Sequence, residues 1–244
     1  MVQVFHCNPL QENAYLLWDD TREGVVVDPG FDGDAELSRC RTFLKENDIC
    51  LKEIWLTHGH FDHILGVTAL VRENPVPVRL HPADRPQLER ARLMAAAFGI
   101  DFPGAGFPTV DLADGEELRV GGMTFRVITT PGHTPGGVSF YSAQERILLT
   151  GDTLFAGSIG RTDLPGGEYD DLIVSIMDKL MGLDGDVEIL PGHGGVSDIA
   201  TERTHNPFLQ PFNEPDDPDL SVEIEMIFSS ICRMERKLSS WERA

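Results

Sequence analysis

The run Thr57-His58-Gly59-His60-Phe61-Asp62-His63 limits this 244-residue chain more than any other segment. Residues two apart point to different sides of a helix, so His58 and His60 cannot share a helical face. In an extended loop after a strand, the same two side chains point to one side and can bind a single ion. Asp62 and His63 then diverge and can serve a second ion nearby. The run therefore predicts a metal site at the end of a strand.

Three more potential ligands each follow a short apolar run and stand beside glycine or proline: His133, Asp152 and His193. Glycine at such places lets the backbone turn sharply and approach an ion closely. Any one of the three could be an ordinary turn residue, but the same pattern at four strand ends favours one shared site. The remaining histidines are predicted to take no part: His6, His81 and His205.

Strand-like and helix-like segments alternate along the first two hundred residues. The strands are predicted at 2–6, 14–18, 25–28, 53–56, 117–120, 124–128, 138–141, 146–149 and 187–190. Helical spacing of apolar residues predicts helices at 35–47, 64–72, 84–98 and 169–181. Strand clusters in each half with helices between them predict a mixed α/β fold, in which two sheets are faced by helices.

The C-terminal part of the chain has a different composition. Residues 211–219 contain three prolines and four acidic residues, which is typical of an extended linker. Beyond it, apolar residues recur at steps of three or four over residues 220–244 and predict an amphipathic helix. Its apolar stripe could dock on its own domain, cover the substrate site or form a homodimer contact. We therefore predict one metal-binding domain over residues 1–210, a linker and a terminal helix.

Charge and cysteine content disfavour several classes of protein. With 40 acidic and 20 basic residues the formal net charge is −20, which repels phosphate backbones, so no nucleic-acid partner is expected. No apolar segment is long enough to span a bilayer, and Met1 to His6 does not have the pattern of a signal peptide. The four cysteines are scattered, without C-x-x-C spacing: Cys7, Cys40, Cys50 and Cys232. We therefore expect free, mostly buried thiols, a cytoplasmic location and no membrane partner.

Taken together, the histidine-rich run and the three later ligands resemble the metallo-β-lactamase-fold hydrolases over about residues 2–210. The resemblance implies a four-layer αβ/βα sandwich, with two mixed β-sheets flanked by helices and a dinuclear metal site at their edge. It implies that one ion is bound by His58, His60 and His133. The other ion would be bound by Asp62, His63 and His193, with Asp152 bridging the two.

Within that family, Gly151 to Gly167 resembles the glyoxalase II branch, and Glu202 to Phe208 is similar to the end of its compact bacterial members. The branch hydrolyses thioesters of glutathione, so the resemblance implies a small-molecule thioester substrate. Zinc is the expected metal, and iron or manganese could replace it. Arg161 occupies the place of a basic residue that binds the glutathione carboxylate, although it could instead pair with an acid such as Asp163. Only 34 residues follow Gln210, so most of the helical domain that contacts glutathione in full-length enzymes is missing and the thiol stays open.

Two cations that share a water lower its pKa toward neutrality, and Asp62 is the residue expected to orient that water and take its proton. No protein nucleophile is evident, since the chain has no G-x-S-x-G elbow. The main competing hypothesis is a persulfide dioxygenase of the same superfamily, which shares the run Gly160 to Asp163 and would use one iron.

Four further classes of protein fit the sequence less well. Flavodiiron oxidoreductases have a glutamate at the position of His60, which disfavours that class. Common zinc β-lactamases have a cysteine at the position of Asp152, which disfavours them too. A tRNA-processing nuclease conflicts with the net charge of −20. A non-catalytic metal-binding scaffold would be expected to have lost ligands, whereas this chain keeps all seven.

Overall fold

The computed structural model describes residues 1–213 and divides the chain into two units, Met1–Leu209 and Gln210–Ala244. Of the second unit, one short helix is described, α6 (Gln210–Asn213). The predicted linker overlaps α6 at residues 211–213; the rest of the linker and the predicted helix at 220–244 lie outside the described residues. The domain boundaries and the homodimer contact therefore stay predictions.

The first sheet has six strands in the order β1-β2-β3-β4-β5-β6. Their bounds are β1 (Val2–Cys7), β2 (Glu12–Trp18), β3 (Glu23–Val27), β4 (Cys50–Trp55), β5 (Val78–Leu80) and β6 (Val110–Asp111). The strands from β1 to β3 pair antiparallel, whereas those from β3 to β6 pair parallel. Parallel neighbours need crossover connections, which are supplied by α1 (Gly33–Glu46), α2 (Val67–Glu73) and α3 (Arg85–Ala97).

The second sheet also has six strands, in the order β14-β13-β10-β9-β8-β7. Their bounds are β7 (Glu117–Val120), β8 (Met123–Thr129), β9 (Val138–Ser142), β10 (Ile147–Gly151), β13 (Glu188–Pro191) and β14 (Ser197–Asp198). All neighbours are antiparallel except β10 and β13. A small hairpin of β11 (Leu154–Phe155) and β12 (Ser158–Ile159) and the helix α4 (Tyr169–Val174) lie between β10 and β13, and α5 (Ile199–His205) follows β14.

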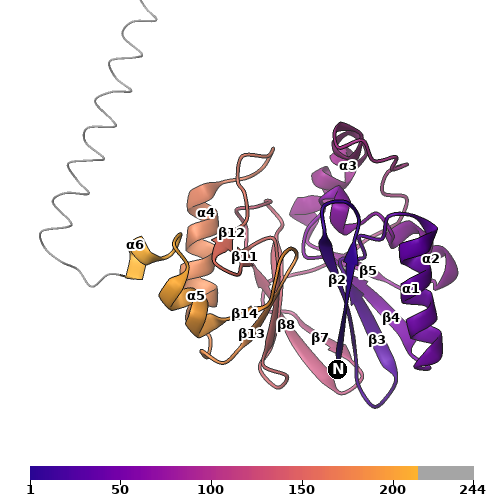
Figure 1. The fold of residues 1–244 in the computed structure, drawn as a ribbon, viewed down its shortest axis with the longest axis horizontal. Helices are drawn as coiled ribbons and strands as arrows, with labels where there is room; N and C mark the ends of the chain where they lie inside the picture. The colour runs from indigo at the N-terminus through magenta and orange to yellow at the C-terminus, as the bar shows by residue number, and fades with distance from the viewer. Residues whose placement is uncertain (214–244) are drawn as a thin grey trace, which may run out of the picture. The chain divides into compact units, whose positions relative to one another are not determined.

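The two sheets pack face to face, and each has helices on its other face. In β2, Tyr15 and Leu17 belong to the core between the sheets, whereas Leu16 packs in the core that contains α1 residues. In β10, Leu149 belongs to the inner core and Leu148 packs with residues of α4. This alternation is what the pleat of a strand produces. Figure 1 shows α1 and α2 outside one sheet and α4 and α5 outside the other, so the predicted four-layer αβ/βα sandwich with two mixed sheets is confirmed.

Within residues 1–213, the predicted strands and helices all form, with ends that shift by a few residues. The strands missing from the prediction are two or three residues long, which is too short to show an alternating pattern: β5, β6, β11, β12 and β14. The helix predicted at 169–181 is α-helical only to Val174 and continues as a π-helix over Ser175–Leu180. Its last turn is closed by a hydrogen bond of 2.9 Å from the Met181 N–H to the Ile176 carbonyl.

Two smaller predictions can be compared with the described residues. Within residues 1–213, no helix is long and apolar enough to cross a membrane. Cys7 and Cys40 are free and buried, as predicted, whereas Cys50 is free and exposed. Cys232 lies outside the described residues.

Candidate metal centre

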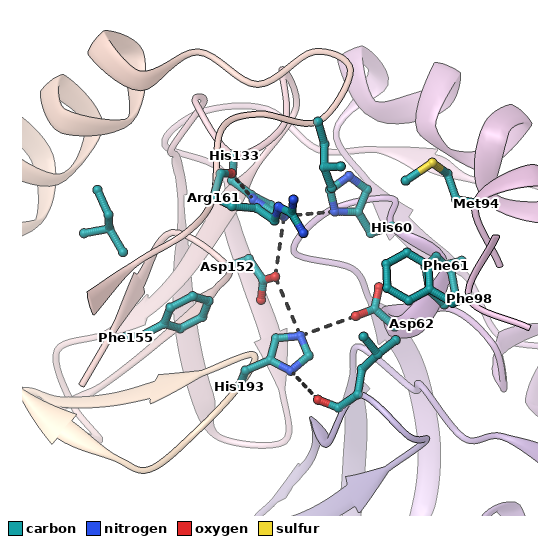
Figure 2. A pocket seen from close by; sticks show the side chains of 13 residues that line it. His60, Phe61, Asp62, Met94, Phe98, His133, Asp152, Phe155, Arg161 and His193 are labelled. Carbon is teal, nitrogen blue, oxygen red and sulfur yellow. Dashed lines mark hydrogen bonds and ion pairs between the residues drawn. The ribbon is translucent and has the colours of Figure 1, made fainter. Parts of the chain in front are cut away.

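The seven predicted ligands come together where strands of both sheets end. His58 and His60 follow β4, and Asp62 and His63 lie in a single 3-10 turn, η1 (Phe61–His63). The other three follow β8, β10 and β13 in turn: His133, Asp152 and His193. Figure 2 shows the side chains that face the cavity at this place, among them His60, Asp62, His133, Asp152 and His193. The sequence pattern of polar residues at strand ends therefore corresponds to one cluster in space.

The first group of donors consists of His58, His60 and His133. Their ligand nitrogens all lie within 4.8 Å of one another, and the three residues are buried. His60 Nδ1 and His133 Nε2 are 2.9 Å apart, which is close enough for both to face one cation. Burial and the neighbouring His133 lower the pKa of His60 to about 3. A neutral imidazole is the form that binds a metal, so this group is suited to a cation at neutral pH.

The second group consists of Asp62, His63 and His193, whose ligand atoms also lie within 4.8 Å of one another. His193 Nε2 is 3.3 Å from Asp62 Oδ2, and His63 Nε2 is 3.8 Å from the same oxygen. His63 is fully buried, and His193 is partly exposed to the cavity.

The carboxylate of Asp152 lies between the two groups. Its Oδ2 is 3.5 Å from His133 Nε2 in the first group and 3.7 Å from His193 Nε2 in the second. Its Oδ1 is 3.4 Å from His63 Nε2. One side chain thus reaches donors of both groups, which is the position that a bridging carboxylate needs.

Several of these donor atoms are buried and have no hydrogen-bond partner within residues 1–213. They are His58 Nε2, His63 Nε2 and Asp152 Oδ1. An unpartnered buried polar atom costs about 1–3 kcal/mol, so such atoms are rare unless a water or an ion satisfies them. Three of them in a cluster of imidazole and carboxylate groups fit divalent cations.

The opposite ring nitrogens of His133 and His193 are held by the surrounding protein. His133 Nδ1 lies 2.7 Å from the Arg161 carbonyl oxygen, and His193 Nδ1 lies 3.1 Å from the Leu10 carbonyl oxygen. Because a carbonyl only accepts, each Nδ1 donates, and the lone pair on Nε2 is left to face the site. This orientation is what metal-binding histidines require.

Asp28 and Thr57 have a similar orienting role that the sequence pattern did not predict. Asp28 accepts from the Thr57 N–H at 2.7 Å and from the Thr57 hydroxyl at 2.5 Å, and it lies 3.1 Å from His63 Nδ1. Asp28 is also close enough to His58 and His63 to share a metal ion with them. Its oxygens, however, already accept hydrogen bonds from Thr57 and lie against His63 Nδ1. A signal was present, since Asp28 is the last residue of the strand-like run at 25–28 and precedes Pro29-Gly30.

Asp84 was also missed, because the sequence pattern marks it only as the start of the helix at 84–98. Its side chain is fully buried and accepts hydrogen bonds from the Gly59 N–H (2.7 Å), the Gly136 N–H (2.7 Å) and the Thr134 hydroxyl (2.9 Å). Gly59 belongs to the histidine run, and Thr134 and Gly136 belong to the loop that carries His133. No local pattern distinguishes Asp84 from other acids at helix starts.

Glu12 is the third acidic residue that the sequence pattern did not indicate. It is fully buried at the start of β2, and neither carboxylate oxygen has a hydrogen-bond partner among the described residues. Its Oε1 lies 3.8 Å from His63 Nδ1. Burial raises the pKa of Glu12 well above its usual range.

A cavity of about 330 Å³ opens over the donors. It is lined by Leu10, His60, Phe61, Asp62, Met94, Phe98, His133, Asp152, Phe155, Ile159, Arg161, Leu164 and His193. Arg161 lies at the cavity as predicted, but its Nε and one terminal nitrogen donate to the two carboxylate oxygens of Asp163, both at 2.7 Å. The pairing with Asp163 that the sequence left open is therefore present, and the role of Arg161 toward a substrate stays a prediction.

The three histidines predicted to take no part belong to none of the donor groups found in residues 1–213. His6, for example, is held 2.8 Å from the Asn13 side-chain oxygen.

Comparison with known protein families shows to which family this chain belongs. The sequence profile of the metallo-beta-lactamase superfamily matches residues 7–193, which include all seven donors. The chain belongs to this superfamily. The resemblance to the metallo-β-lactamase-fold hydrolases is thereby confirmed, together with the fold.

Relatives from the superfamily share most of their length with this chain. The hydroxyacylglutathione hydrolase GloC of Haemophilus influenzae is 35% identical over 210 residues, which cover 85% of this chain and 97% of GloC. The crystal structure of BLEG-1 B3 metallo-beta-lactamase has 39% identity and a TM-score of 0.76, with 86% of this chain and 99% of that chain covered. The crystal structure of TTHA1623 in a di-iron-bound form has 38% identity and a TM-score of 0.76, with coverages of 85% and 100%. This chain is thus a hydrolase-like member of the superfamily with a His/Asp cluster suited to metal binding.

Proposed function

We propose that this protein is a dinuclear metal-dependent thioesterase of the glyoxalase II type. Its substrate would be an S-2-hydroxyacylglutathione or a related small thioester. The observation that carries the proposal is the position of Asp152 between two complete groups of three donors, within 3.7 Å of a histidine in each. The similarity to the hydroxyacylglutathione hydrolase GloC supports the choice of thioester over other acyl compounds.

We assign the two groups of donors to two metal ions. Zinc is the metal we favour, and iron and manganese are the alternatives. His58, His60 and His133 would hold one ion, and Asp62, His63 and His193 the other. Asp152 would bridge them. When bound, such a pair of cations lowers the pKa of water toward neutrality and polarises a carbonyl group. The di-iron form of TTHA1623 supports a pair of metals on this scaffold.

The protein's own residues then orient the reactants. Asp62 lines the cavity, and its Oδ2 lies 3.3 Å from His193 Nε2, close enough for one cation to bind both atoms. In this position it would orient an attacking water and accept its proton. The carbonyl oxygens of Arg161 and Leu10 and the carboxylate of Asp28 hold the imidazoles in place, so the donors do not have to reorganise when substrate arrives.

A β-lactam is a second substrate class for the assays. BLEG-1, which is 39% identical, is a B3 metallo-beta-lactamase, and a β-lactam also presents a carbonyl carbon to an attacking water. The persulfide dioxygenase hypothesis differs because it would need one iron rather than two metals. We also retain as proposals a cytoplasmic location and the absence of nucleic-acid and membrane partners.

The decisive experiment is a metal count combined with a substrate panel. The purified protein, loaded separately with zinc, iron or manganese, would be assayed on S-lactoylglutathione, other thioesters, a β-lactam and, with oxygen uptake, glutathione persulfide. We expect two metals per chain and thioester hydrolysis. A His58→Ala/Asp62→Ala variant should lose both, whereas His205→Ala, an exposed histidine away from the donors, should keep both. Hydrolysis of none of the thioesters in any metal form would refute the proposal, and oxygen uptake on persulfide with one iron would replace it.

A further inference from the structure

The walls of the cavity are apolar around the donors. Seven of the lining residues are aliphatic, aromatic or thioether side chains: Leu10, Phe61, Met94, Phe98, Phe155, Ile159 and Leu164. Five others are donors of the metal-binding cluster, and the last is Arg161. A substrate that reaches the donors therefore meets apolar surface almost everywhere else.

The apolar residues lie on both sides of the donors. Figure 2 shows Phe61, Phe98 and Met94 on one side and Phe155 on the other, with His193 and Asp152 nearer to Phe155. The ring centroids of Phe61 and Phe98 are 5.3 Å apart, and the ring centroid of Phe155 lies 6.2 Å from that of His193. Phe98 is 49% exposed although it is aromatic. A thioester centred on the donors would place its acyl group against one wall and its thiol group against the other.

Arg161 offers little to an anionic substrate. Its guanidinium makes two parallel hydrogen bonds of 2.7 Å with Asp163, so its charge is already balanced. A carboxylate that displaced Asp163 would then lie beside a second carboxylate. Among the described residues that line the cavity, no other lysine or arginine is present. The S-acylated glutathione moiety carries two carboxylates and one ammonium group, and the protein's net charge of −20 disfavours its approach.

We propose that this site selects thioesters with an uncharged, apolar thiol moiety over thioesters of glutathione. The proposal rests on the proposed thioesterase function and, of the substrates named there, favours a related small thioester over an S-2-hydroxyacylglutathione. Phe98 on one wall and Phe155 on the other would be the specificity-determining residues, because both are aromatic and face the cavity from opposite sides of the donors.

The test uses four substrates that combine two acyl groups with two thiols. Lactoyl and phenylacetyl thioesters of glutathione and of benzyl mercaptan would be compared by kcat/KM, each divided by its rate of hydrolysis by hydroxide alone. With either acyl group, we expect the benzyl thioester to be favoured by about tenfold or more. Equal or better values for glutathione would overturn the specificity and leave the thioesterase function intact.

A binding measurement separates the specificity from catalysis. Two thioethers that cannot be hydrolysed, benzyl phenacyl sulfide and S-phenacylglutathione, would be titrated calorimetrically into the metal-loaded protein. We expect the first to bind at least about tenfold more tightly. If none of the four thioesters is hydrolysed, the proposed function fails, and this pair of dissociation constants alone decides the specificity; equal values or tighter binding of the glutathione derivative would reject it.

Variants connect the preference to named residues. Phe98→Ala and Phe155→Ala should each lower kcat/KM for the benzyl thioesters by about tenfold and change the glutathione thioesters less. Phe208→Ala, an exposed phenylalanine that does not line this cavity, serves as the matched control and should change neither. Arg161→Ala should change the ratio of the two thiols by less than about threefold. A selective tenfold loss on glutathione thioesters in Arg161→Ala, about 1.4 kcal/mol, would show that Arg161 recognises glutathione and would overturn the proposal.

Discussion

The backbone N–H of Gly59, which lies between His58 and His60, donates a hydrogen bond of 2.7 Å to the buried carboxylate of Asp84. The same carboxylate accepts from the Gly136 N–H at 2.7 Å, in the loop that carries His133. One side chain therefore sets the separation of two loops that are far apart in the sequence and belong to different sheets. A Cβ on Gly136 would lie 2.6 Å from the Asp84 backbone nitrogen, so the close approach also depends on glycine.

Replacing Asp84 by alanine should weaken both folding and metal binding. The N–H groups of Gly59 and Gly136 and the hydroxyl of Thr134 would lose their buried hydrogen-bond acceptor. We therefore expect the free energy of unfolding to fall by about 3 kcal/mol or more. Denaturant unfolding of the metal-free protein and a metal count after dialysis would measure the two effects. Asp111→Ala, which removes a surface ion pair with Arg85, should cost less than about 1 kcal/mol. Equal losses in the two variants would contradict the role assigned to Asp84.

Asp152 is expected to be needed for both ions, because its carboxylate lies within 3.7 Å of a histidine nitrogen in each donor group. In Asp152→Ala the metal content should fall to one ion or fewer per chain. Thioesterase kcat should fall by at least about 10³-fold, which corresponds to about 4 kcal/mol in the barrier. Mass spectrometry of the native protein would count the ions independently of activity. Retention of two tightly bound ions would show that the carboxylate does not bridge them.

Gly192 should not tolerate a side chain. A Cβ there would lie 2.3 Å from Asp152 Oδ1 and 2.7 Å from His63 Cε1, so Gly192→Ala should displace donors of the second group. Gly195→Ala is a matched control in the same loop, because a Cβ at Gly195 meets no atom within 4 Å. We expect at least about tenfold weaker metal binding in the first variant and less than about a twofold change in the second. Similar dissociation constants for both variants, from competition with a chelator, would contradict the packing described.

The stability of the turn next to β8 should depend on acid pH through Asp114. The Thr129 backbone N–H and hydroxyl donate to its carboxylate at 2.8 and 2.9 Å and lower its pKa below the ordinary value of 3.8. A lowered folded-state pKa stabilises the protein above pH 3.8, and this contribution disappears as the pH falls through the folded-state pKa. Because water screens this exposed carboxylate, Asp114→Ala should cost at most about 1 kcal/mol at about pH 6 and nearly nothing below the folded-state pKa. A pH-independent difference between the stabilities of the variant and the unchanged protein, measured by denaturant unfolding, would argue against this interpretation.

The strand ends explain why so much of the candidate metal site could be predicted. Each ligand follows an apolar run that is long enough to be recognised, and carboxyl ends of strands are where loops converge in such folds. His58, His133 and His193 could thus be predicted from the sequence alone. Asp84 and Glu12 could not, since each is a single acid whose importance comes from burial against segments far away in the chain. Strands as short as β5 and β6 were missed because two or three residues carry no periodicity.

The candidate metal donors and the layers that present them could be predicted from the sequence, because hydrophobic periodicity and ligand chemistry are local properties. How those side chains are oriented and what surrounds them depends on tertiary contacts. The orientation of His133 depends on the Arg161 carbonyl, and the charge of Arg161 is balanced by Asp163, two residues along an exposed loop. Phe98 and Phe155 line the same cavity only because the segment after α3 and the β11–β12 hairpin meet over the donors. Burial and hydrogen bonding between distant segments are absent from a sequence pattern, and here they set the charge and the apolar walls of the cavity.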